Sequence, residues 1–583
     1  MDDMPENSKV TIEILNPRGV LQSIPVSGLV NPRPTSLNGK KVALMSEKVE
    51  SLYFLNALEE LLKKKYPSAT FLHFDSPSNP ARPDNTSEVA SKCDVWLQGV
   101  KTSGSSIVDY DIKMEKLGKP GAAFCIDSLL SQRKRLAEVN GMPALRIVSI
   151  PGIEYLSAEG YPKKMKPVAA YVLNATVKAL TLPLTAAEKT PKPFIYDYGP
   201  LKFSGNSYME TIEKFQQYCA DNYLSDGLPV ISPTREAVGW MLTGVNRSLS
   251  EEIGFLSPRN GLATVEKIAV NAVMAGAKPE YLPVIIAAIE CVAEPGFNLY
   301  HLSTSTGSPT PLIWVNGPIA KEIGMNPGMG FLGRGNRANN TIGRAIGLCL
   351  INIGWRLMDA DSGFTGDPEG FCNFTFAENE QESPWESFAV ENGYKPEEST
   401  VTINETMAYN RNGPGGGMSS QTMEQSLDSI TKMMMGTGGI INRLMFYKGA
   451  RYQLSLNPTL ARQLANAGFT KQSLAKWLYE KTCIKWEQLK QEEKETIKNL
   501  VSLGFIPGLK MQDIGDGTVI PAFENSEQLA ILVAGDAGGN TVLWNSPVGS
   551  TFINSDAHVV MKNPVKPFMT KVIHGAALTQ AGR

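Results

Sequence analysis

Residues 41–45 (KVALM) and 51–65 (SLYFLNALEELLKKK) decide the fold of the N-terminal part of the chain. The first segment is a short apolar run, which is typical of a buried strand. In the second segment, apolar residues recur at three- and four-residue spacing and lysines gather in the last turn, which predicts an amphipathic helix. A strand expected at residues 70–74 completes a β-α-β unit, and such units imply a parallel sheet.

The alternation of strands and helices continues along the chain. Strands are expected at residues 94–100 and 121–126, with a helix near residues 107–117 between them. We therefore predict a multidomain α/β fold whose N-terminal domain is a doubly wound, flavodoxin-like parallel sheet. Ligands of such sheets bind beyond the carboxyl ends of the strands, and the loop at residues 101–106 lies at one of these ends.

The bulk properties of the chain limit its class. At 583 residues it is too long for one hydrophobic core, so roughly three or four domains are expected. The net charge of −2 leaves no electrostatic footprint for nucleic acid or an anionic membrane surface. The longest apolar stretch, residues 281–293, contains Pro283 and Glu290 and is shorter than the about 20 residues that a membrane span needs. It predicts a buried helix and no membrane partner.

Cysteine and histidine usage indicates a reducing compartment. The seven cysteines are scattered without CxxC spacing, which argues against a disulfide framework. The first nine residues (MDDMPENSK) lack the apolar region of a signal peptide, so we expect a cytoplasmic protein. None of the four histidines has a neighbour at metal-ligand spacing. No metal site is therefore expected, and no cofactor is assigned.

Changes in composition along the chain predict its domain organisation. The expected parts are a disordered terminus (1–9), an α/β domain opening with a strand at residues 10–15 (10–186), a linker (187–192), a middle α/β domain (193–395) and a C-terminal α/β domain (396–583).

The loop after the strand expected at residues 94–100 carries a family resemblance. Residues 99–106 (GVKTSGSS), followed by Asp111 and Glu115, resemble the UGSC family, and so do residues 15–19 (LNPRG). The resemblance covers about residues 10–185. It implies a loop of selenocysteine or cysteine, glycine, serine and cysteine between a strand and a helix. From about residue 220 to the end, the chain resembles a poorly characterised bacterial region that is often found with or near such domains.

Serines replace the redox pair of that family in this chain. Its first and last motif positions fall on Ser103 and Ser106. A helix N-terminus lowers the pKa of a thiol enough to make it reactive, whereas a serine hydroxyl is not ionised there and forms no disulfide. The resemblance therefore implies no thiol redox chemistry at this loop. Ser103, Ser105 and Ser106 remain candidates for binding an anionic substrate, the alternative being a loop kept only for folding.

A glycine- and arginine-rich segment is the second candidate for substrate binding. Residues 328–344 (GMGFLGRGNRANNTIGR) match neither a P-loop nor a dinucleotide-binding fingerprint. Glycines let the backbone approach a ligand, and guanidinium groups form paired hydrogen bonds with carboxylate or phosphate. The alternative is an arginine-buttressed loop at a domain or subunit interface. The candidates are Arg334, Asn336, Arg337, Asn339 and Arg344.

Carboxylates in the middle region are candidates for acid/base chemistry. Glu378 and Glu380 would share one face of a strand, and burial would raise a carboxyl pKa into a useful range. The alternative is a solvated acidic turn. Glu266 lies within an apolar helical segment, where a charge pair with Lys267 is the structural alternative.

Two further side chains are candidates for catalysis. His301 precedes a hydroxyl-rich loop (YHLSTSTGSPTP) and is a candidate base, with a hydrogen-bonded structural histidine as the alternative. Cys372 is the candidate reactive thiol, although no histidine is near it in the sequence.

These features predict an enzyme that acts on a small anionic substrate by acid/base chemistry, of lyase or hydrolase type, with its pocket in residues 226–390. One alternative is a relative of thiol or selenol reductases that uses Cys372 or a partner thiol. Another is a non-catalytic scaffold or ligand-binding subunit. A homo-oligomer or a partner subunit is compatible with the long apolar helices.

Overall fold

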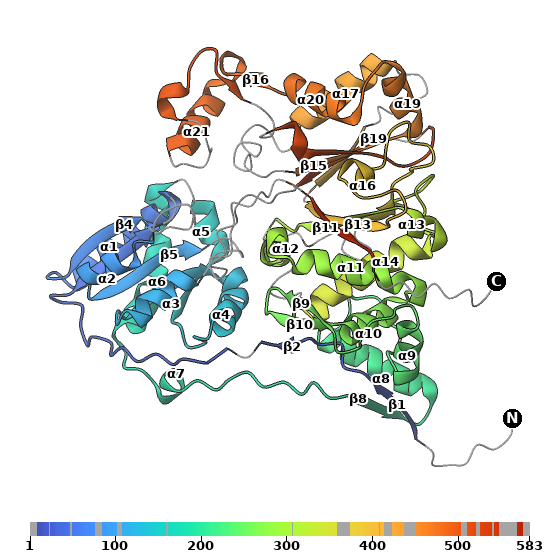
Figure 1. Ribbon diagram of the computed structural model, residues 1–583. Coiled ribbons are helices and arrows are strands. Elements are labelled where there is room, and N and C mark those ends of the chain that lie inside the picture. The colour runs from blue at the N-terminus through green and yellow to red at the C-terminus, as the bar shows by residue number, and fades with distance from the viewer. Residues whose placement is uncertain are drawn as a thin grey trace.

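The computed structural model in Figure 1 consists of an N-terminal lobe and a larger lobe. It describes residues 9–22, 24–46, 49–75, 84–101, 108–158, 161–305, 307–357, 366, 374–406, 408–412, 422–436, 451–502, 510–520, 525–538, 541–546 and 568–574.

The N-terminal lobe is built on a five-stranded parallel sheet. Its strands in spatial order are β4 (Thr70–Asp75), β3 (Lys41–Ser46), β5 (Val95–Lys101), β6 (Gly121–Ile126) and β7 (Ile147–Ile150). With β3 counted first, the order is 2-1-3-4-5, which is that of flavodoxin-like sheets. The predicted α/β fold and parallel sheet are therefore confirmed.

Helices cover both faces of this sheet. One buried cluster joins the sheet to α1 (Val49–Lys65), α5 (Gly152–Ala158) and α6 (Met165–Thr181). A second joins its other face to α2 (Thr86–Lys92), α3 (Asp109–Lys116) and α4 (Leu130–Val139). The strands carry apolar side chains on both faces because both are covered, which explains the continuous burial of β6.

Close approach of α1 to β5 requires a glycine. The backbone N–H of Val100 donates to Ser51 Oγ at 2.9 Å. A Cβ on Gly99 would lie 2.0 Å from the same oxygen, so no larger residue fits there. This contact holds the first turn of α1 against the carboxyl end of β5.

The first two strands lie outside the parallel sheet. β1 (Val10–Ile14) pairs antiparallel with β8 (Leu201–Gly205), and β2 (Val20–Leu21) pairs with β10 (Gly261–Thr264) beside β9 (Glu252–Leu256). The strand expected to open the N-terminal α/β unit therefore belongs to the larger lobe. The parallel sheet is inserted between strands of that lobe, and two extended connections join the lobes along the bottom of Figure 1.

Two four-stranded sheets form the centre of the larger lobe. The first has the order β12 (Phe374–Ala377), β11 (Thr310–Asn316), β13 (Thr400–Thr406) and β20 (Met569–Val572). The second has the order β14 (Ala408–Asn412), β19 (Thr541–Ser546), β15 (Arg451–Leu456) and β18 (Leu529–Val533). The antiparallel pairing of β11 with β13 crosses the domain boundary that we expected near residue 395.

An aromatic core separates the two sheets. Trp314 of the first sheet and Trp544 of the second belong to one buried cluster, in which Phe376 stacks on Trp544 with ring centroids 5.7 Å apart. Every residue of β11 and β13 is buried, so both strands need a cover on each face. Helices supply the outer covers.

Helices form the outer layers of this lobe. The first sheet is covered by α10 (Val265–Ala275), α11 (Leu282–Ala293) and α14 (Arg337–Asn352), and the second by α17 (Met423–Gly436), α19 (Pro458–Asn466) and α20 (Lys471–Lys481). The buried helix expected at residues 281–293 is α11. None of the described helices is long and apolar enough to cross a membrane.

Shorter elements complete the described parts of the chain. They include α7 (Ala186–Lys189), α8 (Tyr208–Asp221), α9 (Arg235–Leu242), α12 (Leu299–Thr304), α13 (Pro318–Glu322), α16 (Phe388–Glu391), α21 (Gln491–Ser502), β16 (Ile484–Lys485) and β17 (Val519–Ile520).

Direct contacts join the two lobes at α4. Gln132 Nε2, in the first turn of α4, donates to the backbone oxygen of Thr304 in α12 at 3.2 Å. Arg259 pairs with Glu138 of the same helix at 2.7 Å, and its guanidinium lies 4.7 Å from the ring centroid of Phe194. The position of α12 relative to the parallel sheet is therefore fixed by contacts as well as by the connections.

One ion pair anchors the second connection to the N-terminal lobe. Both oxygens of Glu188 accept from Arg146, at 2.8 and 3.1 Å, and one of them also accepts the backbone N–H of Thr185 at 2.8 Å. The hydrogen bond from Arg146 is the main cause that lowers the pKa of Glu188 to about 2. The connection is thus held by a charged carboxylate.

Glu188→Gln tests this anchor. A carboxyl group whose pKa is lower in the folded than in the unfolded state stabilises the folded state at pH values above the unfolded pKa. This stabilisation is lost as the pH falls through the folded pKa. We expect the variant to unfold at lower urea concentration than the wild type at pH 7. That difference should shrink between pH 4.5, the ordinary value, and about pH 2. Glu154→Gln, an exposed change on α5, is the control; a Glu188→Gln difference that is constant with pH would contradict the assignment.

Candidate functional site

A buried histidine and a buried glutamate meet between α12 and β13. His301 Nδ1 lies 3.4 Å from Glu405 Oε2, and the two side chains are only 5% and 7% exposed. Asn298 caps α12 by accepting the backbone N–H of His301, which sets where the helix begins. Glu405 occupies the register position opposite Pro311 of β11. Helix capping and strand register together bring the imidazole and the carboxylate into contact.

The pairing determines the chemistry of the imidazole. A buried charge is costly unless a partner compensates it, so the carboxylate is stable here only with a donor. In the tautomer that carries its proton on Nδ1, the imidazole donates to the carboxylate, and Nε2 is then the basic atom of the ring. Such an arrangement equips a histidine to accept and return a proton.

Several buried residues close to His301 or Glu405 in the sequence carry hydroxyl groups. They are Ser303, Thr304, Ser305, Ser308, Thr310 and Thr406. Figure 1 shows α12 on the side of the larger lobe that faces α4 and α5 of the N-terminal lobe. Tyr300 of the same helix packs against the buried cluster of the N-terminal lobe. The pair therefore lies beside the contact between the lobes.

Glu405 was not among the sequence candidates. It lies 104 residues after His301, and only the β11–β13 pairing brings the two together. The signal available was a carboxylate in a strand segment otherwise made of serine, threonine, asparagine and aliphatic residues (STVTINET). An acidic residue in a strand buried along its whole length indicates a partner, which sequence alone does not name.

Two of the acids predicted from the sequence, Glu378 and Glu380, lie close together. Asn316 Nδ2 donates to Glu378 Oε2 at 2.6 Å and to Glu380 Oε1 at 2.7 Å. Glu380 is half-buried and also accepts the backbone N–H of Gly317 at 2.9 Å. The amide of one buried asparagine thus holds both carboxylates at the carboxyl ends of β11 and β12.

Glu378 is held by an ion pair that the sequence did not indicate. Its Oε1 lies 3.1 Å from Lys471 Nζ, and its Oε2 also accepts the backbone N–H of Phe388 at 2.8 Å. Lys471 lies 3.1 Å from Glu391 as well. Burial raises the pKa of Glu391, and the charge of Lys471 opposes that effect. With donors on both oxygens, Glu378 fastens α16 and α20 to the first sheet.

Lys471→Met tests how much this cluster contributes to the stability of the fold. Removing one partner of a buried ion pair leaves an uncompensated charge, which typically costs about 3–5 kcal/mol. We expect a loss of that size in the free energy of unfolding, measured by urea denaturation, and partial recovery when Glu378→Gln is added. The control is Lys476→Met on the exposed face of the same helix, with an expected change within about 0.5 kcal/mol. Equal stability of the Lys471 and Lys476 variants would contradict the assignment.

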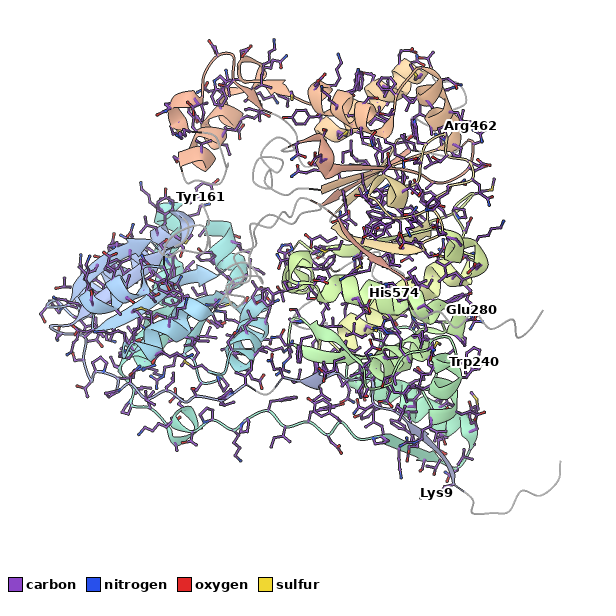
Figure 2. All side chains as sticks on the ribbon, viewed as in Figure 1. Lys9, Tyr161, Trp240, Glu280, Arg462 and His574 are labelled. Carbon is purple, nitrogen blue, oxygen red and sulfur yellow. The ribbon has the colours of Figure 1, made fainter. Side chains whose placement is uncertain are left out.

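The arginines of residues 328–344 make contacts within the protein. Arg344 forms a two-point ion pair with Asp226, at 2.7 and 2.9 Å. Arg337 donates twice to the backbone oxygen of Gly276, and Arg334 is exposed. Figure 2 places Glu280, four residues after Gly276, on the side of the larger lobe away from the N-terminal lobe. This segment and α12 therefore lie on different sides of that lobe.

The two asparagines of this segment shape its loop. Asn336 caps α14 by accepting the backbone N–H of Asn339 at 2.9 Å. Asn339 Nδ2 donates to the backbone oxygens of Asn326 and Phe331, both at 3.0 Å. These contacts match the alternative of a buttressed loop. Substrate binding by Arg334, Asn336, Arg337, Asn339 and Arg344 stays a prediction.

Glu266 lies in the first turn of α10, where a carboxylate is favoured by the helix dipole. Its neighbour Lys267 donates to the backbone oxygen of Asn16 at 2.6 Å. Burial lowers the pKa of Lys267, and the charge of Glu266 opposes that effect. The charge interaction considered as the alternative is thus present, and catalysis by Glu266 stays a prediction.

Ser103, Ser105, Ser106 and Cys372 lie outside the described residues. Of the six described cysteines, five are buried and Cys483 is half-buried. Burial raises the pKa of Cys93 to about 11 and that of Cys219 to about 12. Within the described parts of the chain, no group of three or more His, Cys, Asp or Glu side chains is placed to hold a metal ion.

Comparison with known proteins identifies part of the chain. Residues 13–181 match the UGSC family, which confirms the resemblance of the N-terminal part. A search of curated proteins finds no match. Among solved structures, a fungal multi-domain GH3 β-N-acetylglucosaminidase with a GCN5-related glucosamine N-acetyltransferase region is 14% identical, with a TM-score of 0.17. The likeness covers 41% of this chain and only 24% of that one, and it is too low to bear on fold or function.

Proposed function

We propose that this chain, whose residues 13–181 match the UGSC family, is an acid/base enzyme of hydrolase or lyase type acting on a small molecule. The observation that carries the proposal is the buried contact of His301 with Glu405, 3.4 Å apart. A histidine oriented by a carboxylate is a common arrangement for proton transfer in enzymes.

The location of the pair supports the proposal. The helix that bears His301 contacts Gln132, in the first turn of α4, and α4 follows the carboxyl end of β6. In open α/β sheets, ligands bind outside the carboxyl ends of the strands. A substrate bound at this edge of the parallel sheet would lie on the side of the N-terminal lobe that contacts α12.

Arg337 and Arg344 bind groups within the protein, so the proposal does not use them to bind a substrate. It rests on proton transfer alone. An anionic substrate remains an expectation from the sequence. The alternative reductase hypothesis depends on Cys372 or on a partner thiol. The raised pKa values of the buried cysteines give it no support from the described residues.

His301→Gln tests the proposed function. Turnover would be measured on a panel of small carboxylic esters, amides and β-hydroxy acids, with and without a carboxylate or phosphate group. Loss of a general acid/base lowers rates by about 10²–10⁴-fold, so we expect a decrease of that size in kcat/KM on any substrate of the panel that is turned over.

The matched control is His73→Gln. His73 also pairs with a glutamate, Glu59, at 2.6 Å, but its side chain is 39% exposed and lies on β4. We expect this variant to retain wild-type turnover. Equal activity of the two histidine variants would contradict the proposal. Alkylation of all thiols should leave turnover unchanged, whereas loss of activity on alkylation would favour the reductase hypothesis.

A further inference from the structure

A buried serine seven residues after His301 in the sequence has no hydrogen-bond partner for its hydroxyl among the described residues. Ser308 is 8% exposed, and the described structure gives its Oγ no hydrogen-bond partner. Its φ of 55° lies in the left-handed region, which residues other than glycine seldom adopt. An unsatisfied buried hydroxyl is costly in a folded protein, and a catalytic role is one explanation for such a group in a native structure.

Two hydrogen-bonded turns and the strand register connect Ser308 to the chain segments that carry the pair. The backbone N–H of Ser305 donates to the oxygen of His301 at 2.9 Å, and that of Ser308 donates to the oxygen of Ser305 at 3.2 Å. Two successive turns thus separate the serine from the histidine. Toward the C-terminus, Pro311 follows Ser308 by three residues, and Pro311 is the register partner of Glu405.

The neighbouring hydroxyls are engaged in other contacts. Ser303 Oγ donates to the backbone oxygen of Ser257 at 3.4 Å, and Thr304 Oγ1 donates to that of Tyr300 at 2.8 Å. Ser305 Oγ accepts the backbone N–H of Gly307 at 3.2 Å. Within this group, Ser308 is the hydroxyl that the described contacts leave for another role.

We propose that Ser308 is the nucleophile of a serine, histidine and glutamate triad. His301 is its base, and Glu405 is the positioning residue that orients the imidazole. This inference rests on the proposed function and narrows it to hydrolysis of carboxylic esters or amides. Such triads are recognised by the roles of their members and occur in several chain orders. Contacts between nucleophile and base are often long before the substrate binds.

The reaction balances with the substrate and water alone. Ser308 Oγ attacks the carbonyl carbon while its proton passes to His301. Collapse of the tetrahedral intermediate breaks the bond to the leaving alcohol or amine, which takes that proton from the imidazolium. A water molecule then attacks the acyl-serine ester, with His301 again accepting a proton. The proton returns to Ser308 Oγ as the acid is released.

The test is covalent labelling of the full chain with a fluorophosphonate. The serine oxygen would displace fluoride from phosphorus, and His301 would take up the hydroxyl proton. We expect one phosphonyl group per chain, located on Ser308 by peptide mass spectrometry. His301→Gln should slow labelling by at least about 100-fold, because the hydroxyl then lacks its base. Ser303→Ala is the matched control and should label at the wild-type rate.

Ser308→Gly is the variant that removes the hydroxyl. Glycine adopts positive φ readily, so this change keeps the backbone conformation, and thermal unfolding would verify that the variant is folded. We expect no labelling of this variant. Failure of the wild type to label, or labelling that persists in Ser308→Gly, would overturn the assignment of the nucleophile.

Turnover of the panel separates this inference from the proposed function. If Ser308→Gly keeps wild-type turnover while His301→Gln loses it, the triad is wrong and acid/base catalysis by the histidine stands. If both variants keep wild-type turnover, the proposed function fails with it. Loss of turnover in both, together with labelling at Ser308, supports both.

Discussion

The contact between a buried imidazole and a buried carboxylate is the interaction on which the functional account depends. His301 and Glu405 come from a short helix and a central strand that are far apart in the sequence. Neither group is stable in an apolar interior without a polar partner. The pair therefore constrains where α12 is placed on the sheet. It also orients the ring of His301, the only described histidine that is buried with a carboxylate.

The way in which the chain is threaded explains why this pair lies beside the parallel sheet. Strands β1 and β2 belong to the larger lobe, so the chain enters that lobe, leaves it to form the parallel sheet, and returns at β8. Two connections limit the separation of the lobes, and Arg259 and Gln132 add direct contacts at α4. The chain thereby holds α12 against the N-terminal lobe next to the start of α4.

Sequence patterns predicted the local elements well and their long-range pairing poorly. The β-α-β alternation after residue 41 specified the parallel sheet, because apolar runs and helical periodicity are local signals. The strand at Val10–Ile14 was recognised, but its pairing with β8 was not, since a strand pattern does not name its neighbour. For the same reason Lys471 and Glu405 were missed. The proximity of Glu378 and Glu380 was expected, because they are two residues apart in the sequence.

The direct test of the central interaction is NMR of the imidazole protons in the full chain labelled with ¹⁵N-histidine. The chain has only four histidines, so few resonances are expected. A proton on Nδ1 of His301 that is bonded to a buried carboxylate should resonate far downfield and exchange slowly with water. The account predicts that Glu405→Gln abolishes this resonance and that Glu59→Gln, at the exposed His73 pair, leaves it in place. The absence of such a resonance, or its persistence in Glu405→Gln, would contradict the account.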